Sequence, residues 1–179
     1  MAGELVTGYE ASFEPAMRAA LAEAKAAVAT GDVPVGAVIL DGAGAVVAHG
    51  RNRREAEGDP TAHAELEAIR GAARTVGGWR LDGLTLVVTL EPCTMCAGAI
   101  TSARLSRLVF GAADPRAGAV GSLWDVVRDQ RLTPAPEVIG GVLADECLTV
   151  LRRFFSERRL PPSRRLARTS GMLTRGGVA

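Results

Sequence analysis

The chain has few aromatic residues and no long, uninterrupted hydrophobic run. Phe, Trp and Tyr make up 4% of its 179 residues, whereas hydrophobic residues make up 47%. Its core must therefore be built mainly from Ala, Val, Leu and Ile. No apolar run reaches the roughly 18 residues that a membrane-spanning helix needs. The first ten residues contain two glutamates and no basic residue. We therefore expect neither a membrane span nor a secretory signal peptide.

Cysteine is also scarce, and the chain has three of them. An odd number argues against a framework of disulfide bonds. Cys93 and Cys96 form a C-x-x-C pair, and thiols must be reduced before they can bind a metal ion. We therefore expect a reducing compartment, most simply the cytoplasm.

The net charge of +1 hides an uneven distribution of charge along the chain. Residues 1–150 contain 13 basic and 19 acidic residues, whereas residues 151–179 contain eight arginines and one glutamate. A basic C-terminal segment suits a polyanionic partner such as RNA. The simpler alternative, a solvated helix face followed by a disordered tail, also fits the charge pattern.

The length predicts one domain over residues 1–160 and a basic, flexible tail over 161–179, because Pro161 and Pro162 end the last helix. Ser12 and Thr61 are the expected caps of the first two helices. Periodicity predicts helices over 12–30, 62–74, 94–103, 122–129 and 143–159, and strands over 35–40, 45–48, 84–90, 105–112 and 138–142. This order predicts a three-layer α/β/α domain with a mixed five-stranded sheet.

The residues that carry chemistry are His63-Ala64-Glu65 and Pro92-Cys93-Thr94-Met95-Cys96. His63, Cys93 and Cys96 supply three donors that suit zinc. A structural zinc site is usually closed by four protein ligands, whereas a catalytic site with three keeps a position open for water. Glu65 is not needed as a ligand and can take a proton from that water. This combination of residues is typical of hydrolytic deamination of nucleobases.

The predicted helix starts explain how the three donors could meet. Cys93 and Cys96 are three residues apart at the start of one helix, so both sulfur atoms can face one point. His63 is expected at the start of another helix. Glu65 is harder to place, because two residues along a helix turn a side chain by about 200°. Periodicity alone therefore does not place His63 and Glu65 on one face.

Beyond this motif, the chain resembles the bacterial tRNA-specific adenosine deaminases. The similarity extends from about residue 13 to residue 159. It is carried by Val33-Pro34-Val35-Gly36-Ala37-Val38, by Asp59-Pro60-Thr61-Ala62-His63-Ala64-Glu65, by residues 89–99 around the two cysteines, by residues 108–112 and by residues 143–147. The resemblance implies a cytidine-deaminase-like fold, one zinc ion per subunit and a homodimer. It also implies conversion of the wobble adenosine of an arginine tRNA to inosine.

The resemblance also suggests roles for individual residues. It implies that His63, Cys93 and Cys96 bind zinc and that Glu65 moves protons. Asn52 corresponds to an asparagine that holds the target base. Positions implied to lie against the RNA, a tRNA anticodon stem-loop, are Asp114, Phe154, Phe155, Arg158 and Arg159. The chain departs from many relatives at Arg51 and Ala113, and both positions bear on RNA contact.

Two other functions remain open from the sequence. A deaminase of a free nucleobase or nucleoside, of the guanine or cytosine type, would share the zinc ligands. The spacing of Cys93 and Cys96 argues against the riboflavin-pathway deaminases, and His63 argues against the free-cytidine branch, which has cysteine there. A non-catalytic zinc or RNA-binding module is the third possibility. Glu65 argues against it, because a structural site has no use for an unliganded carboxylate.

Overall fold

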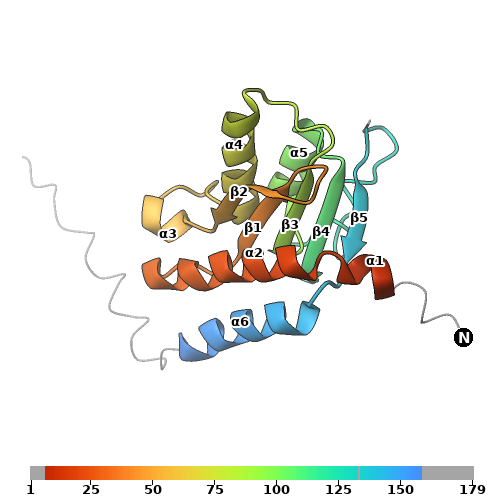
Figure 1. Ribbon diagram of the computed structural model, residues 1–179. Helices are drawn as coiled ribbons and strands as arrows, with labels where there is room; N and C mark the ends of the chain where they lie inside the picture. The colour runs from red at the N-terminus through yellow and green to blue at the C-terminus, as the bar shows by residue number, and fades with distance from the viewer. Residues whose placement is uncertain (1–6, 133, 159–179) are drawn as a thin grey trace, which may run out of the picture.

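The computed structural model of the protein describes residues 7–132 and 134–158 (Figure 1). The helices are α1 (Thr7–Ala11), α2 (Glu14–Ala27), α3 (Arg54–Glu57), α4 (Ala64–Val76), α5 (Thr94–Ser102) and α6 (Ala144–Glu157), with a 3₁₀ turn, η1, at Val28–Thr30. The strands are β1 (Gly36–Leu40), β2 (Val46–Arg51), β3 (Thr85–Leu90), β4 (Arg107–Ala112) and β5 (Glu137–Gly140). None of the helices in this part of the chain combines the length and hydrophobicity needed to cross a membrane.

The five strands form one mixed sheet in the order β2-β1-β3-β4-β5. β1 runs antiparallel to both of its neighbours, β2 and β3. β3, β4 and β5 are parallel to one another, so each parallel step needs a crossover connection. The predicted mixed five-stranded sheet is confirmed.

Helices cover both faces of the sheet. Side chains alternate along each strand, so Ala37 and Ile39 of β1 pack in the core beneath α4 and α5. Val38 and Leu40 point the opposite way and pack with the side chains of α2 and with Cys147 of α6. Figure 1 shows α2 and α6 on one side of the sheet and α4 and α5 on the other. The predicted three-layer α/β/α architecture is therefore confirmed.

Two glycines allow helices to approach the sheet closely. A Cβ atom on Gly36 would collide with the backbone of α2 at Ala20 and Ala24. A Cβ atom on Gly50 of β2 would collide with the backbone of α4 at Ala64 and Ala68. Glycine therefore lets the first turn of α4 pack directly on the end of β2. This contact fixes the position of the segment that contains His63 and Glu65.

The N-terminal half of the protein differs from the prediction at three places. The expected helix over 12–30 is split between α1, α2 and η1, and Ser12 donates to the carbonyl of Tyr9 near the end of α1 instead of capping α2. The predicted end at Gly31 is correct, since its φ of 81° is left-handed. Thr61 does not cap α4, because its hydroxyl bonds Asp59 and His63 is the N-cap residue. The expected loop before α4 contains the short helix α3.

The predicted helix over 122–129 is wrong. This segment forms turns and an isolated antiparallel bridge between Val120 and Asp125. The backbone N–H groups of Val120 and Ser122 donate to the side chain of Glu91, so the chain is held in an irregular loop where a helix would otherwise begin. The expected tail over 161–179 lies outside the described residues.

Candidate metal centre and substrate cavity

Two helix N-termini bring the predicted metal ligands together. His63 is the N-cap residue of α4 and Cys93 is the N-cap residue of α5, both with extended backbone conformation. Cys96 lies in the first turn of α5 and is fully buried. The positive ends of the two helix dipoles favour negatively charged groups at this point. The sequence therefore builds the cluster from two strand-to-helix junctions.

The three donor atoms have the spacing of a zinc site. His63 Nδ1 lies 3.7 Å from Cys93 Sγ and 3.5 Å from Cys96 Sγ. All three donor atoms lie within 4.8 Å of one another. Zinc–ligand bonds of about 2.3 Å to sulfur and about 2.0 Å to nitrogen would separate tetrahedral donors by roughly 3.5–3.8 Å. The donor set and its spacing therefore fit a zinc ion.

The same contacts shift the pKa values of the cluster. A hydrogen bond from Cys96 lowers the pKa of Cys93 to about 3, and contact with His63 acts in the same direction. That shared hydrogen bond, together with burial, raises the pKa of Cys96. Hydrogen bonding to Cys93 raises the pKa of His63. The thiols thus titrate as a pair, with Cys93 ionising first. A divalent cation between them favours ionisation of both.

Glu65 lies beside the cluster, in the first turn of α4. Its side chain is buried, and this burial raises the pKa of its carboxyl group. The structure explains how His63 and Glu65 can meet although they are two residues apart. His63 precedes the helix and has an extended backbone with ψ of 151°, so the helical turn of 100° per residue does not apply between them.

These residues line a cavity of about 150 Å³. His63, Glu65 and Cys93 lie in its wall together with Asn52 and Asp114. Val33, Val35, Arg54, Ala64, Leu90, Glu91 and Ala117 complete the lining. The structure thus brings two of the predicted substrate-contacting residues, Asn52 and Asp114, to the same cavity as His63 and Cys93.

Asn52 follows the end of β2 and is held firmly. Its backbone N–H donates to the carbonyl of Val35, and its side-chain Nδ2 donates to the carbonyl of Val33 at 3.1 Å. Its Oδ1 accepts from the backbone N–H of Arg54 at 3.4 Å. An amide has two donor hydrogens and two acceptor lone pairs. Asn52 therefore keeps one hydrogen and one lone pair for a ligand.

Glu91 is a functional candidate that the sequence reasoning missed. It lies between β3 and Cys93 and is 3% exposed. It accepts hydrogen bonds from the backbone of Asp114 (2.9 Å) and Val120 (3.0 Å) and from both the backbone (3.0 Å) and the hydroxyl of Ser122. Burial alone would raise its pKa, but these bonds outweigh it and hold the pKa below the usual value. The sequence did contain a signal for Glu91, because it is a charged residue that directly follows the uncharged strand and lies two residues before Cys93.

Asp114 is positioned by Glu91 and shapes the next turn. Its backbone N–H donates to Glu91, and its own carboxylate accepts from the backbone of Arg116 and Ala117. Ala117 also lines the cavity. The loop after β4 is thus a wall of the cavity that depends on one buried carboxylate.

The predicted RNA contacts Phe154 and Arg158, in and directly after α6, are not part of the cavity lining. Phe154 is 5% exposed and borders a larger groove of about 590 Å³ between α2 and α6. The Arg158 guanidinium lies 4.4 Å from the centre of the Phe154 ring. Phe155 is exposed, and Arg159 lies outside the described residues. The lining of the larger groove contains none of the three predicted metal ligands.

Comparison with known proteins agrees with this site. A model of the cytidine and deoxycytidylate deaminase zinc-binding region matches residues 11–112. The tRNA-specific adenosine deaminase of Haemophilus influenzae is 49% identical over 146 residues, covering 82% of this chain and 84% of that protein.

Solved structures resemble the protein as well. One from work on A-to-I editing by tRNA:A34 deaminases at the wobble position of transfer RNA has a TM-score of 0.73 and 44% identity, and covers 76% of this chain and 99% of that chain. A guanine deaminase from Bacillus subtilis has a TM-score of 0.53 and 40% identity, and covers 56% of this chain and 64% of that chain. The expected cytidine-deaminase-like fold is therefore confirmed, and the chain belongs to the cytidine and deoxycytidylate deaminase family, whose zinc-binding region it contains.

Proposed function

We propose that the protein is a zinc-dependent hydrolase that converts the wobble adenosine of a tRNA, an arginine tRNA by resemblance, to inosine. The observation that carries the proposal is the position of Glu65, buried beside His63, Cys93 and Cys96 in a cavity that also contains Asn52. The 49% identity with a tRNA-specific adenosine deaminase supports the substrate.

The metal ligands and Glu65 have separate tasks. His63, Cys93 and Cys96 would hold the zinc ion, which when bound lowers the pKa of water and polarises it for attack. Glu65 takes a proton from the attacking water and delivers it to N1 of adenine. The new bond forms between the water oxygen and C6. Burial raises the pKa of Glu65, which suits a group that must take up a proton as well as release it.

The second half of the reaction uses the same carboxyl group. Glu65, again a carboxylate, takes the proton of the new hydroxyl on C6 and delivers it to the amino nitrogen; the C6–N bond breaks, the hydroxyl oxygen becomes the carbonyl, and ammonia leaves. Water is consumed, and the amino group is replaced by the oxygen of inosine. One proton carrier therefore serves both addition and elimination.

Asn52 orients the base for this chemistry. Its side chain is fixed by Val33 and by the backbone of Arg54, so its remaining hydrogen and lone pair point from a rigid support. An adenosine in an anticodon loop is already unpaired, and moving it into the cavity costs less than extrusion from a duplex. Asn52 then holds the base edge while Glu65 moves protons.

Partners and compartment follow from the same proposal. The anticodon stem-loop is the RNA partner, with Asp114, Phe154 and Arg158 as proposed contacts. The protein acts as a homodimer. Leu123 and Trp124 support this, because they are large apolar side chains that are 49% and 55% exposed. Exposed apolar side chains that lie together are typical of a protein–protein interface. Free thiols at Cys93 and Cys96 suit the reducing cytoplasm.

A deaminase of a free base is the second candidate, and the similarity to a guanine deaminase favours it. The two functions require the same metal ligands and differ in what surrounds the base. Residues 151–179 contain eight arginines and one glutamate. This positive charge attracts the phosphates of RNA but does not help to bind an uncharged base. We therefore rank RNA first.

The deciding experiment incubates the zinc-loaded protein with the anticodon arm of an arginine tRNA. Free guanine, cytosine and adenosine are assayed beside it. We expect inosine at the wobble position, little turnover of the free compounds, and loss of turnover when a chelator removes zinc. Turnover of guanine with an unmodified stem-loop would establish the second candidate and contradict the first.

A further inference from the structure

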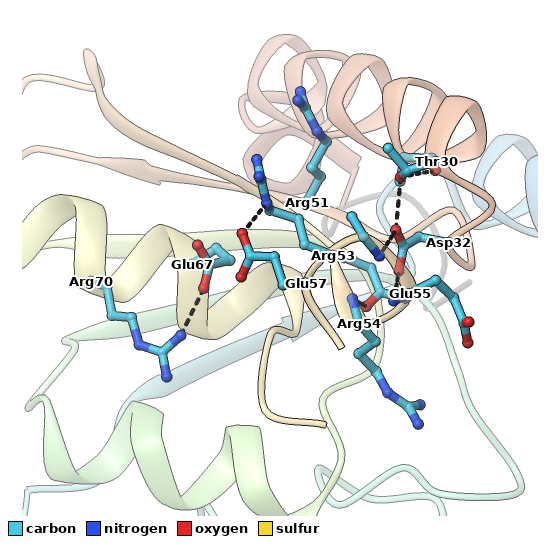
Figure 2. A network of polar contacts seen from close by, with 12 residues as sticks. Thr30, Asp32, Arg51, Arg53, Arg54, Glu55, Glu57, Glu67 and Arg70 are labelled. Atoms are coloured by element: carbon cyan, nitrogen blue, oxygen red, sulfur yellow. Dashed lines mark hydrogen bonds and ion pairs between the residues drawn. The ribbon is translucent and has the colours of Figure 1, made fainter. Parts of the chain in front are cut away.

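Three arginines lie at the end of β2 and the start of α3, and they differ in their partners. Arg51 pairs with Glu23 at 3.3 Å, and Arg53 pairs with Glu57 at 2.5 Å. Arg54 is exposed and has no carboxylate within ion-pair distance among residues 7–132 and 134–158. Figure 2 shows the Arg54 side chain extending away from the Arg53–Glu57 pair. Its charge is therefore available to a ligand.

Arg54 also has a distinctive position, because it lines the cavity beside the metal ligands. The same lining contains three side chains with carboxyl groups, Glu65, Glu91 and Asp114. A nucleotide within RNA brings a negatively charged phosphate on each side of its sugar. The carboxylates of Glu91 and Asp114 repel those phosphates, so a cation at this place would offset a cost of binding. Arg54 is the one lysine or arginine that the described lining contains.

The backbone that supports Arg54 is fixed by a buried acid. The Asp32 side chain is fully buried and accepts from the backbone N–H groups of Glu55 at 2.7 Å and Ala56 at 3.3 Å. Thr30 donates to the same carboxylate at 2.7 Å, and Figure 2 shows this network. The first turn of α3 is therefore tied to the segment after η1.

The same segment joins Arg54 to the residue proposed to hold the base. The Arg54 backbone N–H donates to Oδ1 of Asn52. A base contact and a cation thus stand two residues apart on one rigid piece of backbone. Such an arrangement suits a nucleotide, in which the base and the phosphate are joined through one sugar.

We propose that Arg54 binds a phosphate flanking the target nucleotide and so selects a base within a nucleic acid over a free base. The inference rests on the proposed function, because it takes RNA as the substrate. Arginine suits this role, since its planar guanidinium can donate two parallel hydrogen bonds to a phosphate. Arg54 is a substrate-binding residue and takes no part in proton transfer.

The test compares Arg54→Gln with the matched control Arg53→Gln, which removes the same charge one residue away. For Arg54→Gln acting on the stem-loop we expect kcat/KM to fall about 10-fold through KM, because a contact made equally in ground and transition states changes KM and not kcat. The salt dependence of binding should become shallower by about 0.7 in its logarithmic slope, the value for one phosphate of a single strand. Arg53→Gln should change both much less.

Chemical neutralisation of the phosphate makes the test specific. Two stem-loops carry a methylphosphonate, one on the 5′ side and one on the 3′ side of the target adenosine. One of them should lower kcat/KM of the unaltered protein as much as Arg54→Gln does, and Arg54→Gln should lose nothing more on that RNA. The inference would be overturned if, on both RNAs, the loss from Arg54→Gln and the loss from the methylphosphonate multiplied, as independent effects do. It would also be overturned if Arg54→Gln and the unaltered protein had equal kcat/KM on the unmodified stem-loop.

Failure of the proposed function gives a different result. An unaltered, zinc-loaded protein that leaves the stem-loop unmodified contradicts that function whatever Arg54 does. Stem-loop binding then still decides the role of Arg54. A weaker affinity and shallower salt slope for Arg54→Gln than for Arg53→Gln support phosphate binding, and equal affinities exclude it.

Discussion

Two glutamates in the wall of one cavity are both almost inaccessible to solvent, yet their pKa values are shifted in opposite directions. Glu65 lies in the first turn of α4 and Glu91 follows β3, and they are 4% and 3% exposed. The pKa of Glu65 is raised. The pKa of Glu91 is lowered. Two acids of similarly low solvent exposure thus have pKa values shifted in opposite directions within one site.

The difference lies in the hydrogen-bond donors around each carboxylate. Glu91 accepts four hydrogen bonds from Asp114, Val120 and Ser122. These bonds stabilise its charged form and outweigh the cost of burial. For Glu65 burial is the largest influence on the pKa, and its carboxylate has no comparable set of donors in the described part of the chain. The donors around Glu91 therefore stabilise its charged form, and Glu65 lacks a comparable set among the described residues.

The comparison assigns different tasks to the two acids. A carboxylate whose charge is locked by several donors makes a poor proton carrier but a good anchor for a loop. A buried carboxyl group with few donors can change its protonation state during a reaction. We therefore expect changes at Glu65 to lower the rate of the reaction and changes at Glu91 to lower the stability of the fold. Variants at each position test this difference.

Glu65→Gln should have the largest effect. The amide keeps the size of the side chain but cannot take a proton from water, so we expect deamination of the stem-loop to fall by about 100- to 10,000-fold. The zinc content and the thermal stability should stay close to those of the unaltered protein, because Glu65 is not a ligand. Turnover kinetics, metal analysis and a melting curve measure the three quantities.

Glu67→Gln is the matched control for that experiment. Glu67 lies two residues further along α4, pairs with Arg70 at 2.7 Å and is absent from the cavity lining. Its loss should leave the rate nearly unchanged, since exposed ion pairs contribute little. Normal turnover by Glu65→Gln would remove Glu65 from the mechanism, whereas an equal loss in both variants would point to a general effect of altering α4.

Glu91→Gln should act mainly on stability. The new amide nitrogen cannot accept the hydrogen bonds that one carboxylate oxygen accepts now, so buried N–H groups of the loop lose partners. We expect the free energy of unfolding to fall by about 2–3 kcal/mol, measured by urea denaturation at saturating zinc. Activity should fall much less than for Glu65→Gln at temperatures where the variant is folded. A large loss of activity with unchanged stability would contradict the assignment.

Much of the fold and the metal centre could be predicted from the sequence. Hydrophobic runs without charged residues predicted the five strands, and amphipathic patterns predicted the helices of the outer layers. Both patterns are local and periodic, so they can be recognised in the sequence. His63, Cys93 and Cys96 could be grouped because their residue types and spacing are specific for zinc. The proximity of His63 and Glu65 could not be derived from periodicity, since it depends on the extended backbone of His63 before α4.

Two of the failures, at residues 122–129 and at α3, share a physical cause, which is a hydrogen bond from the backbone to a distant side chain. Residues 122–129 have a helical pattern, but Glu91 takes the backbone N–H groups of Val120 and Ser122. Likewise, Asp32 holds the backbone of α3 across more than 20 positions of sequence. Such long-range bonds leave no periodic signal. The sequence motif marked Glu91 only as a neighbour of Cys93.

Ser122→Ala should have the smallest effect and separates the four bonds of Glu91. It removes the hydroxyl that donates to Oε2 of Glu91 and leaves the Ser122 backbone donor in place. We expect the free energy of unfolding to fall by about 1 kcal/mol, the usual net value of one hydrogen bond, or somewhat more because the acceptor is charged. Ser156→Ala is the control, since its hydroxyl bonds only the nearby carbonyl of Arg153 on exposed α6. If Ser122→Ala cost as much as Glu91→Gln, the hydroxyl alone would hold the loop, and the backbone bonds of Val120 and Asp114 would follow from that one contact.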